Sequence, residues 1–378
     1  MYLDHASTTA IRPCAYEAML PWMQGQWGNP SSMHDQGRQA RQALEDARDV
    51  IAEKINCRAR DIVFTSGATE ANNLALKGVA TTWTTAKNML ISSMEHPSII
   101  ETAEFLASDK IEIRSIAPND EGIVTADCLA ALIDSSTSFA AVMNANNEIG
   151  NINDIKDIAA LCQQHKIHCH TDAVQAVGHI PVDFTELGVD SMSINGHKIG
   201  GPAGIGALVM QRHVRLGTLQ RGGGQELGKR GGTENFIGIL GMSAAIAEAV
   251  DELEVRQKKW KELRDFLITK IKTLPEVLFN THIEKSLPHI LNVSFKNIEG
   301  ESLIIRLDME GICLSSGSAC HADHPEPSHV LKAIGRSAKE AAAALRFSFG
   351  PETSQNELEI AFQKLENLIP QLRHKSAK

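Results

Sequence analysis

The chain has 378 residues, of which 43% are hydrophobic, and it carries a formal net charge of -9 at pH 7. This length suits a single large α/β unit or a large domain with a smaller one, and the apolar content is ample for buried cores. The acidic balance argues against a general nucleic-acid or anionic-membrane binder, because such proteins cluster basic residues on their surface.

The cysteines and the start of the chain indicate the cellular compartment of the protein. The seven cysteines have no paired spacing, which is typical of thiols kept reduced inside a cell. The chain opens on Tyr2-Leu3-Asp4 without a charged and apolar leader, and no apolar run is long enough to span a bilayer. We therefore expect a cytoplasmic protein that has no membrane partner and no direct nucleic-acid partner.

The first 54 residues predict scaffold elements. An extended arm is expected over residues 2–9, and helical patterns follow at residues 13–23 and 34–54. A turn cluster at residues 28–32 separates the two helices. No chemical role for these segments is evident from the residues alone.

A buried strand over residues 61–65 is followed by the small-residue turn of residues 66–70, which opens a helix over residues 71–79. A turn of this kind presents unpaired N–H groups and the positive end of the helix dipole, which together bind phosphate. Capping of the helix by Ser66 or Thr69 explains the same residues equally well.

Strands and helices then alternate along the chain. A helix is expected over residues 151–165, and strands are expected at residues 88–92, 111–116, 139–144, 167–171, 190–194 and 205–210. This alternation predicts a largely parallel sheet with helices on both faces. Ligands of such sheets bind beyond the carboxyl ends of the strands.

The residues that follow these strands are polar and chemically diverse. They are Ser66 to Thr69, Glu95-His96-Pro97, Asn144 to Glu148, Asp172 to Gln175 and His197-Lys198. Singly, each has a structural alternative, because His96 suits a turn and Asp172 suits a helix cap. Their common position at one edge of the sheet predicts a site.

Pyridoxal phosphate is the cofactor that fits this set of groups. Lys198 follows the strand-like run from Ser191 and is the candidate covalent anchor, and Asp172 supplies a carboxylate for the pyridine nitrogen. The turn of residues 66–70 supplies the phosphate site. His168 and His170 share a strand face and also suit a metal pair, but the strand offers no further ligand.

The second half of the chain predicts a smaller α+β domain. The glycine-rich segment of residues 221–235 lacks the strand-to-helix context of a nucleotide-binding loop. Beyond it we expect helices at 237–249, 251–273 and 301–308, strands at 290–295, 312–315 and 343–347, and a final helix. The predicted domains are residues 14–250, and residues 1–13 together with 251–378.

Cys320 lies among small, polar and proline residues, which predict an exposed loop with an accessible thiol. The other cysteines lie mostly in apolar periodic segments, where thiols are inert. Cys320, His321 and His324 also suit a zinc cluster, but no fourth ligand lies nearby. The sequence therefore favours a reactive thiol, with metal binding at Cys320 as a weak alternative.

Taken together, these motifs resemble the cysteine desulfurases, pyridoxal-phosphate enzymes of the class V aminotransferase group with the fold type I architecture. The resemblance covers nearly the whole chain, and its long cysteine loop is similar to that of the iron-sulfur and tRNA-thiolation branch. It implies an α/β fold, with a mostly parallel seven-stranded sheet between helices and a smaller α+β C-terminal domain. It rests on Leu3-Asp4 to Thr8-Thr9, Gly28-Asn29-Pro30, Phe64 to Glu70, Glu95-His96, Asn146 to Gly150, Asp172 to Gln175, Gly196-His197-Lys198, Arg230 to Thr233, Ser315 to Cys320 and Arg346-Phe347-Ser348.

The resemblance implies how the cofactor is held. Lys198 carries it, and His96 stacks on its ring. Asp172 meets the pyridine nitrogen, and Gln175 meets the phenolic oxygen. The phosphate is held by Ala68, Thr69, Asn195, His197 and, from the second subunit of a homodimer, Thr233.

The resemblance also implies the reaction. L-cysteine, held beside the cofactor by Asn146 and Arg346, is converted to L-alanine while its sulfur passes to Cys320 as a persulfide. Lys198 moves the α-proton of the substrate, and His96 exchanges a proton near the thiol. The sulfur then goes to an acceptor protein, either an iron-sulfur scaffold or a tRNA-thiolation enzyme.

Two alternative functions share most of these residues. A selenocysteine lyase or cysteine sulfinate desulfinase would not depend absolutely on Cys320, and a catalytically silent cofactor-binding protein would serve as a sulfur-carrier scaffold. The chain also departs from the family pattern, with Asn195 in place of a usual serine and Val174 in place of a common threonine. It stops soon after Ser376, without the longer tail with which some members dock a scaffold protein.

Overall fold

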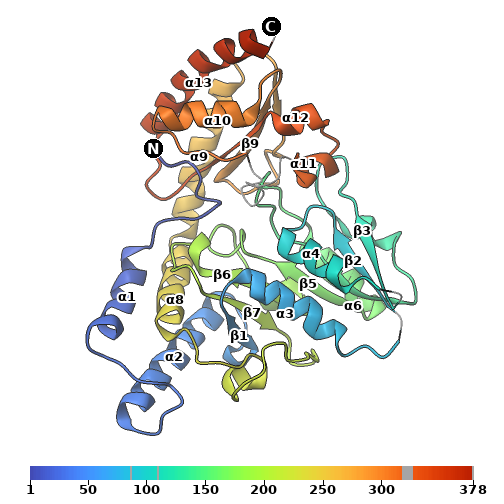
Figure 1. The fold of residues 1–378 in the computed structure, drawn as a ribbon, viewed down its shortest axis with the longest axis vertical. Coiled ribbons are helices and arrows are strands. Elements are labelled where there is room, and N and C mark those ends of the chain that lie inside the picture. Colours follow the sequence, from blue (N-terminus) through green and yellow to red (C-terminus); the bar gives the residue numbers. More distant parts are fainter. Residues whose placement is uncertain (86, 109, 317–326, 377–378) are drawn as a thin grey trace.

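The computed structural model describes residues 1–85, 87–108, 110–316 and 327–376. Its strands form a seven-stranded sheet and a separate three-stranded sheet. The larger sheet occupies the lower part of the molecule in Figure 1, and the smaller sheet lies above it with α10 and α13.

The large sheet has the strand order β1-β7-β6-β5-β4-β2-β3. The strands from β2 to β6 pair in parallel, whereas β7 runs antiparallel to both β6 and β1. The prediction of a mostly parallel seven-stranded sheet is confirmed. Its strands are β1 (Ile62–Thr65), β2 (Lys87–Ser92), β3 (Ile111–Ile116), β4 (Thr137–Ala141), β5 (His168–Asp172), β6 (Ser191–Asn195) and β7 (Gly206–Met210).

Helices cover both faces of this sheet (Figure 1). Neighbouring strand residues belong to different cores, as Leu208 and Val209 do, because successive side chains of a strand point to opposite faces. On one face lie α3 (Ala68–Ala80) and α4 (Pro97–Leu106). The other face is covered by α6 (Ile155–His165), α7 (Phe184–Leu187) and α8 (Phe236–Asp251).

The predicted helices at the start of the chain pack against α8. They are α1 (Pro13–Gln24) and α2 (Asp35–Lys54). In α2, the buried residues Ala40, Leu44, Ala47 and Ile51 recur at helical spacing and form the packing face. Further short helices in this part of the chain include α5 (Ala126–Ala130), η1 (Ala59–Asp61) and η3 (Gln225–Gly228).

A second core forms around the three-stranded sheet. This core includes Leu3 of the N-terminal arm beside residues from Trp260 to Ile369. It agrees with grouping residues 1–13 with 251–378, although the domain boundary stays a prediction. The elements are α9 (Leu253–Ile271), β8 (Val277–Phe279), β9 (Ile290–Phe295), α10 (Gly300–Met309), α11 (His329–Ala333), α12 (Ala338–Ala342), β10 (Ala344–Ser348) and α13 (Gln355–Ser376).

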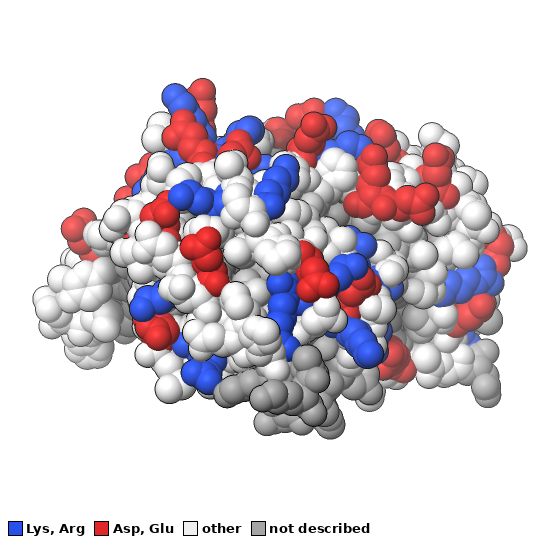
Figure 2. All heavy atoms as spheres, turned by 90° about the horizontal axis from the view of Figure 1, so that it is seen from above, with Lys and Arg blue, Asp and Glu red and all other residues white. Residues whose placement is uncertain are grey.

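The surface at this end of the molecule is highly charged. Figure 2 shows acidic and basic side chains interspersed over it. Several of them form ion pairs between helices, including Lys364 with Glu310 and Lys270 with Glu359, each at 2.7 Å. Among the described residues, we find no helix with the length and apolar character needed to cross a membrane.

Two predicted strand segments differ in the structure. Residues 312–315 form only isolated bridges, from Cys313 to Tyr2 and from Ser315 to Arg346, because two different segments pair with them one residue at a time. The strand predicted to reach Asn144 ends at Ala141. Beyond it, the Met143 N–H donates to the side chain of Glu95 at 2.6 Å, whereas the Asn144 N–H still donates to the Asp172 carbonyl of β5 at 2.8 Å.

Candidate functional site

A cavity of about 380 Å³ lies where the strands of the large sheet end, in the position that the sequence predicts for a ligand. Most of the predicted site residues line it. They are Ala68, Thr69, His96, Asp172, Gln175, Asn195, His197, Lys198 and Arg346. The predicted residues Asn146 and Thr233 lie elsewhere, and Cys320 lies outside the described residues.

Lys198 ends a short 3-10 turn, η2 (Gly196–Lys198), that directly follows β6. A side chain on Gly196 would approach the Pro202 carbonyl and the side chain of Ile205 to 3.0 Å, so this close turn favours glycine. The Lys198 amine donates to the carbonyls of Ala6 at 2.8 Å and Ser7 at 2.6 Å. The N-terminal arm therefore positions the amine at the cavity wall.

Asp172, at the end of β5, is only 5% exposed and is held in a fixed orientation. One carboxylate oxygen accepts from Asn72 of α3 at 2.8 Å, and the other accepts from the Val174 N–H at 3.0 Å. The two hydrogen bonds fix the direction in which the carboxylate faces. An anionic group facing a bound ring nitrogen would keep that nitrogen protonated.

A second carboxyl group, that of Glu95, lies close enough to Asp172 to interact with it. Burial raises the pKa of Glu95 to about 8, and the negative charge of Asp172 adds to the effect. Near neutral pH, Glu95 is therefore mostly protonated.

His96 is the N-cap residue of α4, and this role orients its ring. Its Nδ1 accepts from the Ser98 N–H at 3.1 Å. Because Nδ1 accepts this hydrogen bond, the neutral ring carries its proton on Nε2. The cavity wall thus contains an imidazole with a defined tautomer.

The N-terminus of α3 also lies at the cavity, where Ala68 and Thr69 line the wall. Within the described chain no side chain caps this helix, so its first N–H groups are available to an anion. Asn195 lies close by, since a side chain on Gly67 would meet its amide at 3.9–4.0 Å. The capping alternative for Ser66 and Thr69 is therefore wrong.

His197 lies beside Lys198 and interacts with Thr8 of the arm, its Nδ1 lying 3.1 Å from the hydroxyl oxygen. Burial, together with the nearby charge of Lys198, lowers the pKa of His197 to about 4. His197 is therefore neutral near pH 7 and can contribute hydrogen bonds but no net charge to this end of the site.

These residues fit pyridoxal phosphate. An anion cradle, a carboxylate and an amine line one cavity, and an imidazole flanks them. The contacts of Gln175 also indicate a bound ligand. Its Nε2 donates to the Ala6 carbonyl, while its buried Oε1 lacks a hydrogen-bond partner among the described residues. A buried oxygen of this kind is expected where a polar ligand completes the wall.

Arg346 of β10 brings the three-stranded sheet into the site. Its side chain is 2% exposed and lines the cavity. The Nη2 atom donates to Asp4 at 2.7 Å and to the Ser7 hydroxyl at 2.6 Å, and Nη1 donates to the Asn147 carbonyl at 2.8 Å. Such a guanidinium recognises a carboxylate through its planar fork of donors.

Asn146, which the sequence predicts at the site, does not line the cavity, whereas its neighbour Asn147 does. The Asn146 amide is fully buried, donates to the Met94 carbonyl at 3.0 Å and accepts from the N–H groups of Glu148 and Ile149. Asn147 lines the cavity instead. The two adjacent asparagines offer no sequence signal that separates the turn residue from the wall residue.

Thr233 lies apart from Lys198, in a smaller exposed hollow near Ser66 and Asn235. Its segment is held in place by an ion pair between Arg230 and Glu70 at 2.8 Å. In a single chain, Thr233 therefore does not reach the cavity wall, although Glu70 belongs to the helix that begins there.

The structure describes the two ends of the Cys320 segment, while Cys320, His321 and His324 lie outside the described residues. Before the segment, the Ser315 carbonyl accepts from the Arg346 N–H at 2.7 Å. After it, the Ser328 hydroxyl donates to Glu148 at 2.5 Å. Both ends are thus joined to residues at or next to the cavity.

His168 and His170 of β5, which also suit a metal pair, contact other side chains in the structure. His168 Nε2 and His170 Nδ1 each lie 2.8 Å from the Ser191 hydroxyl. Burial lowers the pKa of His168 to about 4 and that of His170 to about 3. Over the described ranges, no three His, Cys, Asp or Glu side chains gather closely enough to hold a metal ion.

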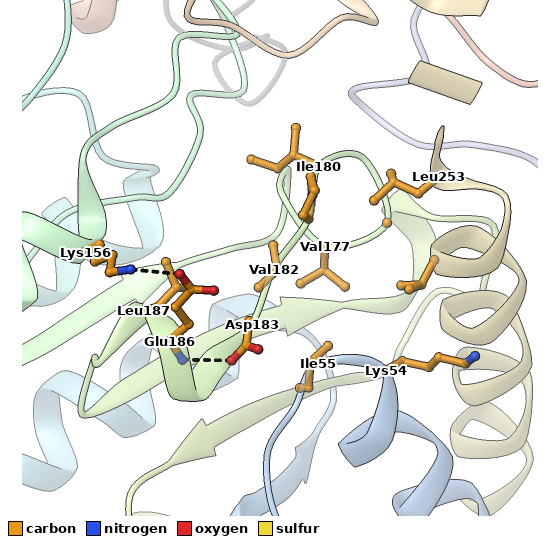
Figure 3. A pocket seen from close by; sticks show the side chains of 13 residues that line it. Lys54, Ile55, Lys156, Val177, Ile180, Val182, Asp183, Glu186, Leu187 and Leu253 are labelled. Atoms are coloured by element: carbon orange, nitrogen blue, oxygen red, sulfur yellow. Dashed lines mark hydrogen bonds and ion pairs between the residues drawn. The ribbon is translucent and has the colours of Figure 1, made fainter. Parts of the chain in front are cut away.

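A second cavity, of about 430 Å³, lies between α2, α7 and the start of α9 (Figure 3). Its wall is mostly apolar and includes Val177, Ile180 and Leu253. At its rim, Lys156 is paired with Glu186 at 2.7 Å. The described lining contains no Cys, His, Ser or Thr.

Comparisons with known proteins match the whole chain. A family model described as aminotransferase class-V matches residues 1–360. The protein "Cysteine desulfurase IscS" of Dictyoglomus turgidum is 42% identical over 375 residues, which cover 99% of this chain and 95% of that protein. The protein of the same description from Klebsiella pneumoniae is 40% identical over 379 residues, covering 99% of this chain and 93% of its own length.

Solved structures agree with these sequence matches. A structure described as a NifS-like protein has a TM-score of 0.93 and 32% identity, with 98% of this chain and 100% of that chain covered. The X-ray structure of a NifS-like protein from Rickettsia africae has a TM-score of 0.87 and 31% identity, with 97% and 99% covered.

Proposed function

The chain belongs to the aminotransferase class-V family, and from this membership we propose that it is a cysteine desulfurase that depends on pyridoxal phosphate. It converts L-cysteine to L-alanine and transfers the sulfur to a cysteine of its own. One observation carries this proposal: the amine of Lys198, the carboxylate of Asp172 and the ring of His96 line one cavity at the ends of the parallel strands.

Pyridoxal phosphate, when bound, supplies an electron sink that weakens the bonds around the α-carbon of the amino acid. Lys198 would hold it covalently, Asp172 would face its ring nitrogen, and Gln175 would face its phenolic oxygen. His96 would lie against the ring. Its phosphate would be held by Ala68, Thr69, Asn195 and His197.

Lys198 has a second role once the amino group of the substrate has replaced it. Its Nζ atom would take the α-proton of the substrate and would later give up a proton. The carbonyls of Ala6 and Ser7 hold Nζ within 2.8 Å, so the base keeps a defined position. His96, with its proton on Nε2, exchanges a proton with the sulfur that leaves or attacks.

Arg346 binds the substrate carboxylate, and Asn147 rather than Asn146 forms the adjoining wall. The guanidinium and the lysine amine both contact Ser7, through its hydroxyl and its carbonyl respectively. This shared contact supports an arrangement in which the carboxylate and the amino group of one small amino acid reach the two side chains together.

Cys320 is the sulfur acceptor in this proposal. Its thiolate attacks the substrate sulfur, forming an S–S bond while the Cβ–S bond breaks, and the electron pair of that bond returns to the carbon framework. Protonation of the carbon then gives L-alanine. The proposal is supported by the hydrogen bonds that join Ser315 and Ser328, at the two ends of the segment, to Arg346 and Glu148.

We also propose that the active unit is a homodimer in which Thr233 completes the phosphate site of the other subunit. Support comes from large apolar side chains that are exposed in a single chain. Trp27 is 71% exposed, Met33 is 91% exposed and Leu227, near Thr233 in sequence, is 72% exposed. Burial of such side chains against a second subunit would stabilise a dimer.

The destination of the sulfur belongs to the same proposal. The long Cys320 segment suits delivery to an acceptor protein, either for iron-sulfur cluster assembly or for tRNA thiolation, in the cytoplasm. Two curated relatives that the chain matches over nearly their full length are described as cysteine desulfurase IscS.

The test is product analysis with purified protein loaded with pyridoxal phosphate. L-cysteine should yield L-alanine and a persulfide on the protein, and Cys320→Ser should lose the persulfide while still binding L-cysteine. A catalytically silent scaffold would release no alanine. A selenocysteine lyase or sulfinate desulfinase would process selenocysteine or cysteine sulfinate equally well with Cys320→Ser.

A further inference from the structure

The N-terminal arm contacts several site residues at once, although the sequence predicts no role for it. The amine of Lys198 and the amide of Gln175 both donate to the carbonyl of Ala6. Asp4, only two residues earlier, contacts Arg346 with its side chain. Asp4 is the acidic group that the proposed reaction leaves without a role.

Asp4, Ser7 and Arg346 form a closed set of three hydrogen bonds. Arg346 Nη2 donates to Asp4 Oδ1 at 2.7 Å and to the Ser7 hydroxyl oxygen at 2.6 Å. The Ser7 hydroxyl in turn donates to the same Asp4 oxygen at 2.9 Å. A single oxygen of Asp4 therefore fixes both the guanidinium and the hydroxyl that supports it.

The burial of this set makes its geometry specific. The Arg346 side chain is 2% exposed and that of Asp4 is 17% exposed. Hydrogen bonds between charged groups in such surroundings are stronger than those between solvated side chains. An arginine side chain has several rotatable bonds, and its plane is fixed only when acceptors hold both Nη atoms, here Asp4 at Nη2 and the Asn147 carbonyl at Nη1.

The backbone of the arm is held independently of the Asp4 side chain. The Leu3 N–H donates to the Cys313 carbonyl at 3.0 Å, and the Ser348 N–H donates to the Leu3 carbonyl at 2.8 Å. The Ala6 N–H donates to the Ser348 hydroxyl at 2.9 Å. Leu3 itself is fully buried in the second core. Changes to the Asp4 side chain therefore leave the path of the arm in place.

We propose that Asp4 is a positioning residue for the substrate carboxylate, and this inference rests on the proposed function. Its Oδ1 atom holds the Arg346 guanidinium in the plane in which it lines the cavity. A carboxylate binds the guanidinium fork best when the two planes coincide, so an arginine with a fixed plane loses less freedom on binding. Asp4 thus acts through Arg346 and makes no contact with the reacting atoms.

Two variants separate the hydrogen-bond acceptor from the charge. Asp4→Asn keeps an oxygen at the same position and removes the charge, whereas Asp4→Ala removes both. If the ion pair between Asp4 and Arg346 had only a structural role, both variants would lose it. The melting temperature of both would then fall. A positioning role instead requires that Asp4→Asn recover most of the ligand affinity that Asp4→Ala loses.

The experiment measures ligand binding to the cofactor-loaded protein by calorimetry, with L-alanine and cysteamine as probes. L-alanine carries the α-carboxylate, and cysteamine has an amine and a thiol but no carboxylate. In Asp4→Ala we expect L-alanine to bind roughly 10-fold more weakly, the size of one lost hydrogen bond to a charged group. Cysteamine should bind as in wild type, and Asp4→Asn should lie within about 3-fold of wild type for both ligands.

The matched control is Asp265→Ala, which removes a carboxylate from an exposed pair with Lys261 at 2.7 Å and should leave both affinities unchanged. Unchanged L-alanine affinity in Asp4→Ala would overturn the inference, as would equal weakening of L-alanine and cysteamine. Wild-type protein that showed no preference for L-alanine and formed none from L-cysteine would overturn the proposed function as well.

Discussion

The amine of Lys198 lies 2.8 Å from the carbonyl oxygen of Ala6, which is 192 residues away in the sequence. This hydrogen bond joins the end of a central strand to the N-terminal arm. The same arm reaches Arg346 through Asp4 and Ser7. The site is therefore complete only when the arm, the large sheet and the small sheet come together.

Replacement of the anchor gives the first prediction. In Lys198→Ala, we expect borohydride treatment to fix no cofactor to the chain, because the amine at the cavity wall is gone. The rate of alanine formation should fall by roughly 100- to 10,000-fold, as for the loss of a general base. Absorbance spectra and product assays check both results, with the exposed Lys166→Ala as the control. Covalent fixation that persisted in Lys198→Ala would place the anchor at another lysine.

Buried histidines should make the fold sensitive to acid. Burial lowers the pKa of His170 and that of His179 to about 3. Because the folded pKa lies below the unfolded value of about 6.5, these residues stabilise the fold fully above pH 6.5 and lose that contribution as the pH falls toward 3. Each should contribute up to about 1.4 kcal/mol per pH unit to the slope of the unfolding free energy.

The matched pair for this prediction is His179→Gln and the exposed His165→Gln. Denaturant unfolding at pH 7, 6 and 5 should show a shallower acid slope for His179→Gln and a wild-type slope for His165→Gln. Equal slopes in all three proteins would show that His179 is not kept neutral in the fold.

Glu95 should give the unfolding free energy a pH dependence opposite to that of the buried histidines. Burial raises its pKa to about 8, above the usual value of 4.5, so the folded state holds a proton that the unfolded state releases. Stability from this group is therefore present below pH 4.5 and is lost as the pH rises toward 8. In Glu95→Gln, which stays neutral, the unfolding free energy should fall less between pH 5 and pH 7.5 than in wild type. A steeper fall in Glu95→Gln would contradict a protonated Glu95.

The shared phosphate site can be tested by mixing two inactive subunits. Lys198→Ala chains and Thr233→Ala chains, unfolded together and refolded, should form some heterodimers in which one site has both an intact Lys198 and an intact Thr233 from the other subunit. Activity at limiting pyridoxal phosphate should exceed that of either parent. If the mixture were no more active than its parents, the site would lie within one chain.

The sequence predicted those site residues whose position follows from a local rule. Asp172 and Lys198 directly follow strands, and parallel strands bring their carboxyl ends to one edge. The contact between Asp4 and Arg346 could not be predicted in this way, because it joins residues 342 positions apart. It depends on the arm pairing with Cys313 and Ser348, which packing between distant segments decides.

The remaining differences between prediction and structure depend on local geometry that the pattern of apolar and polar residues does not reveal. Asn146 and Asn147 are chemically identical neighbours, and only the turn at Glu148 determines which of them faces the cavity. The strand β7 runs antiparallel to β6, because residues 196–205, which connect them, are too few for a crossover helix. Alternation of apolar residues shows that a strand is present but not its direction.

The most direct test of the central claim is a single turnover of L-cysteine, without reductant, followed by peptide mass spectrometry. We expect L-alanine to form together with one added sulfur atom on the peptide that contains Cys320. The same experiment with Cys320→Ser should leave every peptide unmodified. Alanine formation with the sulfur on another cysteine, or release of sulfide with no protein-bound sulfur, would contradict the account.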